Sequence, residues 1–552
     1  MTATADSQAV QVSRDSTTAS DSITVASWTL ASRVTGVVKI AAIGAVFGPT
    51  YLGNAYQFTN SLPNLIYFGL LAGSLFSSLL VPALVQHIDC GNRAAFERVA
   101  GGFLGVTLVA MLALIPVAII LGPFALHAAA GAHASGSAQE SVGRYLIVLF
   151  IPQVFLYGVV GTAAAVMNAH RKFALAAAAP AVENMATIAV LGACAALYGT
   201  GVDVRSVQTG ELLLLGLGTT GAVALHAGTQ WWGARRVGVL LVPRAGWHDH
   251  EVRAIVRRAL PSLAQAGLMA AQVITLLVLA NRVPGGVVAF QIALNFYFLA
   301  IALGATPVAL SLLPSLARFH VEGDVARFRE TLSGGFALGL FVAIPAAVAY
   351  AGLSLPLAQA VSFGRMGTPD GIALVSSALA ALSLAVIGQT AFAIATYASY
   401  ARKDTRTPLV SMMLQAVVCI SLAAIALAVH GKAVLITLGL AYSTSVVVAA
   451  LHLNLVVRRG ASRSGGQSRV AVIRICCAAI LMIGPAWLAA RVVPHWVGPP
   501  LGPRLAIILA ALAGIGVYVG AQAAMRAPEL SWLGAGMRHL RARASAIGAS
   551  DG

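Results

Sequence analysis

The chain alternates long apolar runs with short polar segments, and the runs have the length of membrane-spanning helices. A helix needs about 20 mostly apolar residues to cross the hydrocarbon core, because every backbone N–H and C=O must be paired within the segment. This template predicts an all-α polytopic membrane protein with about 14 transmembrane helices. We expect them at 24–47, 61–86, 99–127, 145–167, 179–198, 211–232, 260–281, 286–313, 334–361, 371–397, 408–429, 433–457, 474–493 and 505–525.

The loops between these helices alternate in charge, which predicts how the protein is oriented. Lys and Arg accumulate in short loops on the cytoplasmic side of a membrane. Here the loops after even-numbered helices hold most of the basic residues, and the loop at 233–258 alone holds six arginines. We therefore expect both termini to lie in the cytoplasm, and the first helix to be an uncleaved span.

Composition agrees with a membrane protein and excludes several other classes. Of 552 residues, 59% are hydrophobic and only 10% are charged, whereas soluble domains carry about 25% charged residues. The net charge of +17 comes from loops between apolar runs, so we expect no nucleic-acid partner. Five cysteines without regular spacing predict neither a disulfide framework nor a metal site.

No motif for hydrolysis or group transfer is present in the sequence. A P-loop, HExxH, GxSxG and an Asp-rich cluster for Mg²⁺ are all missing, and these are the arrangements that such chemistry requires. We therefore expect a protein that is not an enzyme and that uses no cofactor.

An internal repeat relates the two halves of the chain. Leu80–Leu84 followed by Gly101-Gly102-Phe103 recurs as Leu312–Leu316 followed by Gly334-Gly335-Phe336, about 232 residues later. Six helices per half predict two parallel six-helix repeats plus two C-terminal helices, an arrangement typical of alternating-access transporters. The expected divisions are a disordered cytoplasmic tail (1–23), an N-terminal lobe (24–232), a basic linker that is either interfacial or plainly solvated (233–259), a C-terminal lobe (260–457), helices 13 and 14 with their preceding loop (458–525) and a cytoplasmic tail (526–552).

Three charged residues inside the predicted spans are candidates for function. Arg33 and Lys39 lie about 9 Å apart along the first helix, and a guanidinium with an ammonium group could bind phosphate oxygens in a cavity of low dielectric. Alternatively, Arg33 extends to the cytoplasmic headgroups. Glu183 follows Pro180 by three residues, which predicts the first turn of its helix, where the dipole stabilises a carboxylate. We favour a structural role for Glu183, and it is also a candidate for ion coupling.

Several segments together resemble one known family, the MurJ/MviN lipid II flippases of the multidrug/oligosaccharidyl-lipid/polysaccharide exporter superfamily. The likeness covers roughly residues 28 to 460, and the order and spacing of the motifs make it specific. The matching segments are Ser32-Arg33-Val34-x-Gly36, Asn54-Ala55, Leu62-Pro63-Asn64-Leu65, Phe76-Ser77-x-x-Leu80-Val81-Pro82, Met167-Asn168-x-x-Arg171-x-Phe173, Gly238–Arg244, Leu312–Leu316 and Tyr400-x-x-x-Asp404-x-x-Thr407-Pro408.

The resemblance implies a flippase that moves an undecaprenyl-diphosphate-linked peptidoglycan precursor across the bacterial cytoplasmic membrane. It implies a cationic central cavity for the diphosphate and sugar, and a groove made with the last two helices for the lipid tail. Arg33 matches a family arginine, and Lys39 replaces a second one. Four positions depart from the family pattern, with Asn54 and Ala72 replacing acidic residues and Tyr67 and Asn295 replacing arginines. The predicted substrate-binding residues are Arg33, Lys39, Asn54, Asn64 and Asn295.

Other functions remain open at this point. A cationic site with fewer basic residues than the family pattern also fits a flippase for another polyprenyl-linked saccharide or a cation-coupled exporter. A third alternative is a transport-inactive scaffold for cell-wall synthesis proteins. The expected partners are the lipid-linked glycan precursor, membrane lipids and, for the scaffold, cell-wall synthesis proteins.

Overall fold

The computed structural model describes residues 27–66, 79–130, 136–458, 466–498 and 501–530. These residues form helices joined by turns, with no strand among them, so the all-α prediction is confirmed. Thirteen helices in the described part of the chain are long and apolar enough to cross a membrane. The remaining predicted helix, 61–86, includes 67–78 and therefore lies partly outside the described residues.

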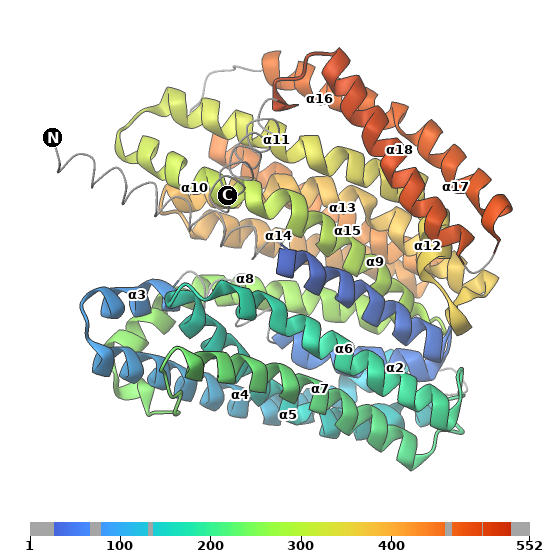
Figure 1. The fold of residues 1–552 in the computed structure, drawn as a ribbon, viewed down its shortest axis with the longest axis horizontal. Helices are drawn as coiled ribbons and strands as arrows, with labels where there is room; N and C mark the ends of the chain where they lie inside the picture. Colours follow the sequence, from blue (N-terminus) through green and yellow to red (C-terminus); the bar gives the residue numbers. More distant parts are fainter. Residues whose placement is uncertain (1–26, 67–78, 131–135, 459–465, 499–500, 531–552) are drawn as a thin grey trace, which may run out of the picture. The chain divides into compact units, whose positions relative to one another are not determined.

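The helices form two compact units, drawn in Figure 1 with the colours of the sequence. Unit 1 contains the described residues up to Ile292 together with Phe363–Gly371, and unit 2 contains the others. In unit 1 the elements are the helix Ser27–Phe47, α2 (Tyr51–Ile66), α3 (Val81–Asp89), α4 (Arg93–Ala130), α5 (Gly136–Ala169), α6 (Phe173–Tyr198), α7 (Thr209–Arg236), α8 (His250–Ala280) and the beginning of α9 (Gly286–Ala300).

Unit 2 begins within α9 and contains the later helices. They are the π-helical turn η4 (Ile301–Ala305), α10 (Thr306–Val321), α11 (Val325–Gly352), α12 (Ser354–Val361), α13 (Pro369–Ala401), α14 (Arg406–Ala423), α15 (Lys432–Arg458), α16 (Gly466–Leu481), α17 (Ile483–Val497) and α18 (Gly502–Ala524). This grouping reflects packing, whereas the predicted lobes are defined by the sequence repeat and stay a prediction.

Two of the breaks within the predicted helices lie close to a proline. The predicted helix 334–361 divides into α11 and α12 at Leu353, and the predicted helix 474–493 divides into α16 and α17 at Met482. Pro356 and Pro485 have no N–H to donate to the carbonyls four residues earlier, so one helical hydrogen bond is missing at each point. A reading based on apolar length alone misses such breaks.

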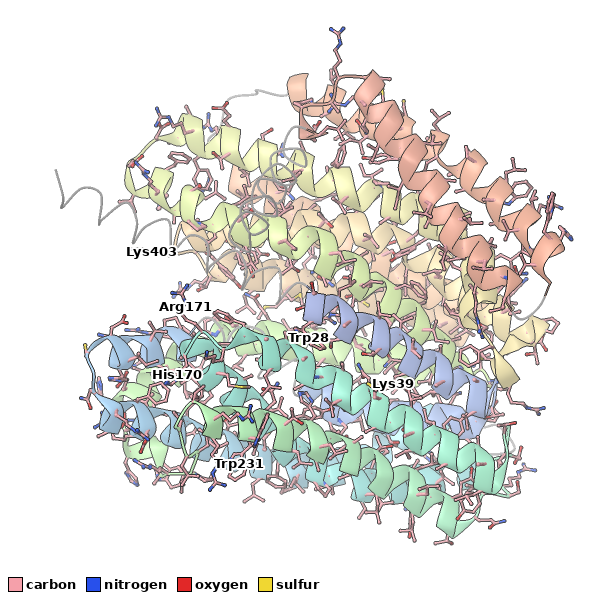
Figure 2. All side chains as sticks on the ribbon, in the orientation of Figure 1. Trp28, Lys39, His170, Arg171, Trp231 and Lys403 are labelled. Carbon is pink, nitrogen blue, oxygen red and sulfur yellow. The ribbon has the colours of Figure 1, made fainter. Side chains whose placement is uncertain are left out.

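The repeat is recognisable in the local structure of each unit taken by itself. Helix α4 begins at Arg93 and α11 at Val325, 232 residues later. Arg171 and Lys403, also 232 residues apart and labelled in Figure 2, both adopt left-handed backbone conformations, with φ of 58° and 61°. Non-glycine residues seldom adopt this conformation. The shared turn geometry therefore supports the predicted repeat.

Within unit 1, the linker after α7 packs on α4. Val239 and Leu241 are buried while Leu240 and Val242 are exposed. The Arg244 N–H donates a 2.9 Å hydrogen bond to the Gly101 carbonyl, and a Cβ on Gly105 would collide with the Arg244 carbonyl. Small residues on α4 therefore allow the linker backbone to approach the helix closely.

Candidate functional site

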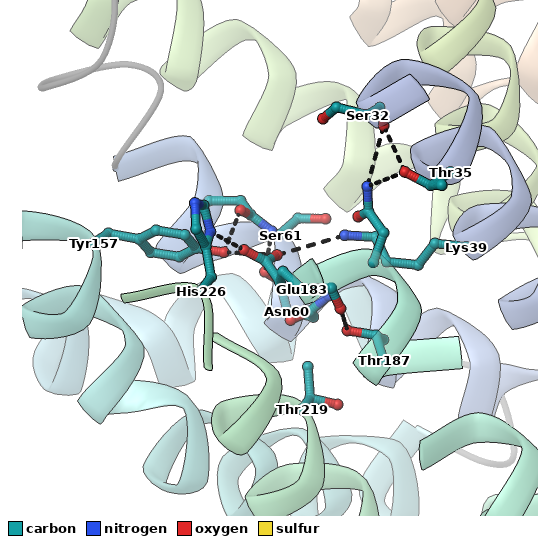
Figure 3. Close-up of polar contacts among 12 residues, drawn as sticks. Ser32, Thr35, Lys39, Asn60, Ser61, Tyr157, Glu183, Thr187, Thr219 and His226 are labelled. Carbon is teal, nitrogen blue, oxygen red and sulfur yellow. Dashed lines mark hydrogen bonds and ion pairs between the residues drawn. The ribbon is translucent and has the colours of Figure 1, made fainter. Parts of the chain in front are cut away.

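Lys39 and Glu183 form the centre of a polar cluster inside unit 1. The helix Ser27–Phe47 carries Lys39, whose Nζ lies 3.6 Å from Oε1 of Glu183 on α6. Their side chains are 18% and 10% exposed, and Figure 3 shows Lys39 extending toward the carboxylate. An unpaired charge at such a position is strongly disfavoured, so each ion stabilises the other.

Glu183 lies further inside its helix than the sequence predicted. The prediction placed it in the first turn after Pro180, but α6 begins at Phe173, so that part of the prediction is wrong. Pro180 cannot donate to the Ala176 carbonyl, and Nε2 of Gln230 on α7 donates to that carbonyl instead, at 3.1 Å. This substitute partner explains how the helix continues through Pro180, because freed backbone groups in a membrane must be paired again.

Two residues that the sequence reading missed complete the cluster. His226 on α7 places Nδ1 2.8 Å from Oε2 of Glu183. The Tyr157 hydroxyl on α5 lies 3.2 Å from Oε1 of Glu183 and donates to Asn64 Oδ1 at 2.7 Å. His226 and Tyr157 are only 3% and 2% exposed. The signal for His226 was available, because it is an ionisable residue within an apolar run.

Hydrogen bonds next to the cluster join its helices, and one buried nitrogen atom of the cluster has no hydrogen-bond partner among the described residues. Asn184 donates to the Ser32 carbonyl and to Oγ1 of Thr35, at 3.2 and 3.1 Å, which ties α6 to the first helix. Nε2 of His226 is buried and has no hydrogen-bond partner among the described residues. A buried imidazole nitrogen without a partner is unusual, so this atom is available for one further hydrogen bond.

Arg33 is on the same helix as Lys39 but is not part of the cluster. It is exposed, and it forms no ion pair within the described part of the chain. Its guanidinium is therefore accessible to an anion or to lipid headgroups, the two alternatives that the sequence left open.

The Asn54 side chain forms hydrogen bonds with the backbone of a turn elsewhere in unit 1. It is fully buried, its Nδ2 donates to the Val283 carbonyl at 2.8 Å, and its Oδ1 accepts from the Val287 N–H at 3.0 Å. These bonds hold the turn between α8 and α9. The geometry favours a structural role for Asn54 over the predicted contact with substrate.

The other predicted residues are distributed over the two units. Asn64 belongs to the cluster in unit 1 through Tyr157, whereas Asn295 is half-buried on α9 in unit 2. Tyr67 and Ala72 lie outside the described residues. The described residues contain no group of three His, Cys, Asp or Glu side chains that could hold a metal ion.

Comparison with curated sequences relates the chain to bacterial flippases. It is 26% identical over 513 residues to a probable lipid II flippase MurJ of Vibrio cholerae, covering 90% of this chain and 93% of the relative. It is 27% identical over 400 residues to a probable lipid II flippase MurJ of Haemophilus influenzae, covering 69% of this chain and 75% of the relative.

Solved structures show the same architecture. A lipid II flippase MurJ in an inward closed conformation matches with a TM-score of 0.70 at 17% identity, covering 91% of this chain and 98% of the other. A multidrug resistance transporter of the MATE family and MOP superfamily, in an inward-facing conformation, matches with a TM-score of 0.62 at 14% identity, covering 82% and 98%. At these identities the likeness concerns the fold.

A sequence model of one protein family matches most of this chain. The model described as lipid II flippase MurJ matches residues 43–501, which include most of the described helices and both halves of the repeat. This chain therefore belongs to the lipid II flippase MurJ family.

Proposed function

We propose that this protein moves lipid II, the undecaprenyl-diphosphate-linked peptidoglycan precursor, across the bacterial cytoplasmic membrane. Membership in the MurJ family supports this cargo, and the charge distribution of the loops supports a topology with both termini in the cytoplasm. The two six-helix lobes rock to expose the headgroup alternately on each side.

The observation that carries the proposal is the buried pair of Lys39 and Glu183, with an exposed arginine on the same helix. Arg33 lies about 9 Å from Lys39 along the axis and is accessible. In the proposed sequence of events the diphosphate first meets Arg33, whose planar guanidinium suits phosphate oxygens. The second negative charge then attracts Lys39, whose flexible side chain exchanges Glu183 for the cargo.

When the Lys39 side chain moves to the cargo, Glu183 loses its ion-pair partner. The carboxylate keeps its contact with His226 at 2.8 Å, but it no longer has a permanent cation beside it. The buried carboxylate then depends on its hydrogen bonds with His226 and with the Tyr157 hydroxyl, at 3.2 Å. Glu183 is thus the proposed ion-coupling residue, because departure of Lys39 leaves a buried carboxylate in need of a cation.

The test uses bacteria depleted of their own lipid II flippase. The protein is expressed, its membrane level is measured, and the lipid II accessible on the outer face is quantified. We expect the wild type to restore exposure, the Arg33→Ala/Lys39→Ala variant to lose it, and Lys39→Arg to retain most of it. Arg318→Ala is a matched control, because it removes one cation whose side chain is 77% exposed and, among the described residues, forms an ion pair with Glu322 alone.

The competing functions predict different results in the same cells. A flippase for another polyprenyl-linked saccharide would leave lipid II inside although the protein is folded and abundant. A transport-inactive scaffold would leave lipid II inside and would bind cell-wall synthesis proteins equally well with and without Arg33 and Lys39. Full flipping by the double alanine variant would remove the proposed diphosphate site.

A further inference from the structure

Helix α7 has a groove on the face that it turns away from its neighbours. Its buried positions pack on α5 and α6, while Leu217, Leu225 and Trp232 on the opposite side are 56%, 56% and 46% exposed. This groove has a volume of about 500 Å³, is shallow and open, and is lined by α7 alone. It is lined by Gly221, Ala224, Leu225, Gly228, Thr229 and Trp232.

The groove exists because two residues on this face have no side chain. A Cβ at Gly221 or at Gly228 would meet no atom within 4 Å, so the floor at both positions is open. The only hydroxyl in the lining, that of Thr229, already donates to the Leu225 carbonyl at 2.7 Å. Apart from the indole N–H of Trp232 at one end, the lining therefore offers an apolar channel without a free hydrogen-bond donor.

The dimensions of the groove match one leaflet of a bilayer. From Gly221 to Trp232 the helix rises about 16 Å, which is about half of the hydrocarbon thickness of 30 Å. Trp231 and Trp232 lie at one end of the groove, and Trp residues prefer the interface between hydrocarbon and water. Trp231 is labelled on α7 in Figure 2. The groove thus begins at the interface and ends near the middle of the membrane.

The interfacial end of the groove is strongly basic. Arg236 lies over the Trp232 ring, 3.9 Å from its centroid, and Arg235 lies 5.4 Å from that of Trp231. The sequence has no acidic residue from 212 to 248, so nothing on this segment neutralises the two arginines. Guanidinium groups beside a membrane attract anionic headgroups, and basic sites on membrane helices bind such lipids.

We propose that this groove binds one acyl chain of an anionic phospholipid whose phosphate is held by Arg235 and Arg236. The apolar channel accepts the chain, and the basic end selects for a headgroup with net negative charge. A second copy of the protein fits less well, because a two-fold axis along the membrane normal would bring both pairs of arginines together at the same depth. The site is separate from the cluster around Glu183.

The experiment measures bound lipid on the full-length protein. Protein in detergent is titrated with phosphatidylglycerol or phosphatidylcholine, and native mass spectrometry counts the retained lipids and the copies of the chain. Three variants separate the two parts of the site: Gly228→Leu fills the channel, Arg235→Gln/Arg236→Gln removes the charge, and Gly192→Leu is the control. Gly192 is an exposed glycine on neighbouring α6 that also has open space around it.

We expect the wild type to prefer phosphatidylglycerol, and we expect that preference to fall about 25-fold in Arg235→Gln/Arg236→Gln, at about fivefold for each arginine. Gly228→Leu should weaken retention of the same lipid, and Gly192→Leu should not. Equal retention of both lipids by the wild type would overturn the proposal, as would equal losses in the two leucine variants. Dimers that Gly228→Leu dissociates, without any lipid preference, would assign the groove to a second copy instead.

Discussion

The pairing of Lys39 with Glu183 leads to a quantitative prediction about stability. Lys39→Met and Glu183→Gln each remove one charge with little change in side-chain length. At 3.6 Å and an effective dielectric constant of about 20, two unit charges attract by about 4.6 kcal/mol. Part of this attraction offsets the desolvation of both ions, so we expect a coupling free energy of about 2 kcal/mol.

The two single variants should not be equally affected. Glu183→Gln leaves the Lys39 ammonium in a mostly buried position without a counter-ion, so this variant should be the less stable one. Lys39→Met leaves the carboxylate with His226 Nδ1 at 2.8 Å and with the Tyr157 hydroxyl at 3.2 Å. The double variant has neither an isolated cation nor an isolated anion, and it should regain stability relative to Glu183→Gln.

The assay is a double-mutant cycle on purified protein, unfolded reversibly by increasing the fraction of SDS in mixed micelles. Arg318 and Glu322 provide a matched cycle, because they form an exposed pair four residues apart at the end of α10. Such surface pairs couple by only about 0.3–0.5 kcal/mol. Strictly additive effects of Lys39→Met and Glu183→Gln, or a coupling no larger than that of the surface pair, would refute the assignment of a buried ion pair.

Three further predictions concern the surroundings of the site. Asn54→Ala should destabilise the protein by roughly 3 kcal/mol, because buried backbone groups lose their partners, and SDS unfolding measures this loss. Gln230→Leu should cost about 1–2 kcal/mol, and adding Pro180→Ala should recover most of it, because the new N–H can bond to the carbonyl that Gln230 served. Asp249 caps the N-terminus of α8. Burial raises the pKa of its carboxyl. Hydrogen bonds from backbone N–H groups and the charge of the Arg98 guanidinium outweigh burial and hold the pKa below its usual value of 3.8. Its contribution of about 1 kcal/mol should therefore be present above pH 3.8 and disappear as the pH falls below that value, as thermal unfolding of wild type and Asp249→Ala would show.

Each of these predictions has its own contradicting result. An Asn54→Ala variant as stable as wild type would mean that the turn between α8 and α9 does not depend on the side chain. Gln230→Leu that is not improved by Pro180→Ala would separate the glutamine from the proline. A stability difference between Asp249→Ala and wild type that stays constant to low pH would show that the carboxylate charge is not involved.

The local sequence was sufficient to predict the helical spans and the repeat. In hydrocarbon only a helix pairs its own backbone groups, so apolar runs of the right length, such as 211–232, mark spans without reference to neighbours. The turn around Arg171 and its counterpart around Lys403 could likewise be matched, because both depend on short stretches of chain. Even the candidate residues Arg33, Lys39 and Glu183 could be selected, since charge within a span is costly wherever it occurs.

What the sequence could not determine is which of these residues meet. Lys39, Glu183 and His226 come from three different helices, and only the packing of these helices places a carboxylate between an ammonium group and an imidazole. The continuation of α6 through Pro180 has the same origin, because the partner of the freed carbonyl comes from Gln230 on another helix. Apolar pattern depends on each residue's own preference for lipid or water, which is local. The pairing of buried polar groups depends on distances between helices, and only the tertiary structure sets those distances.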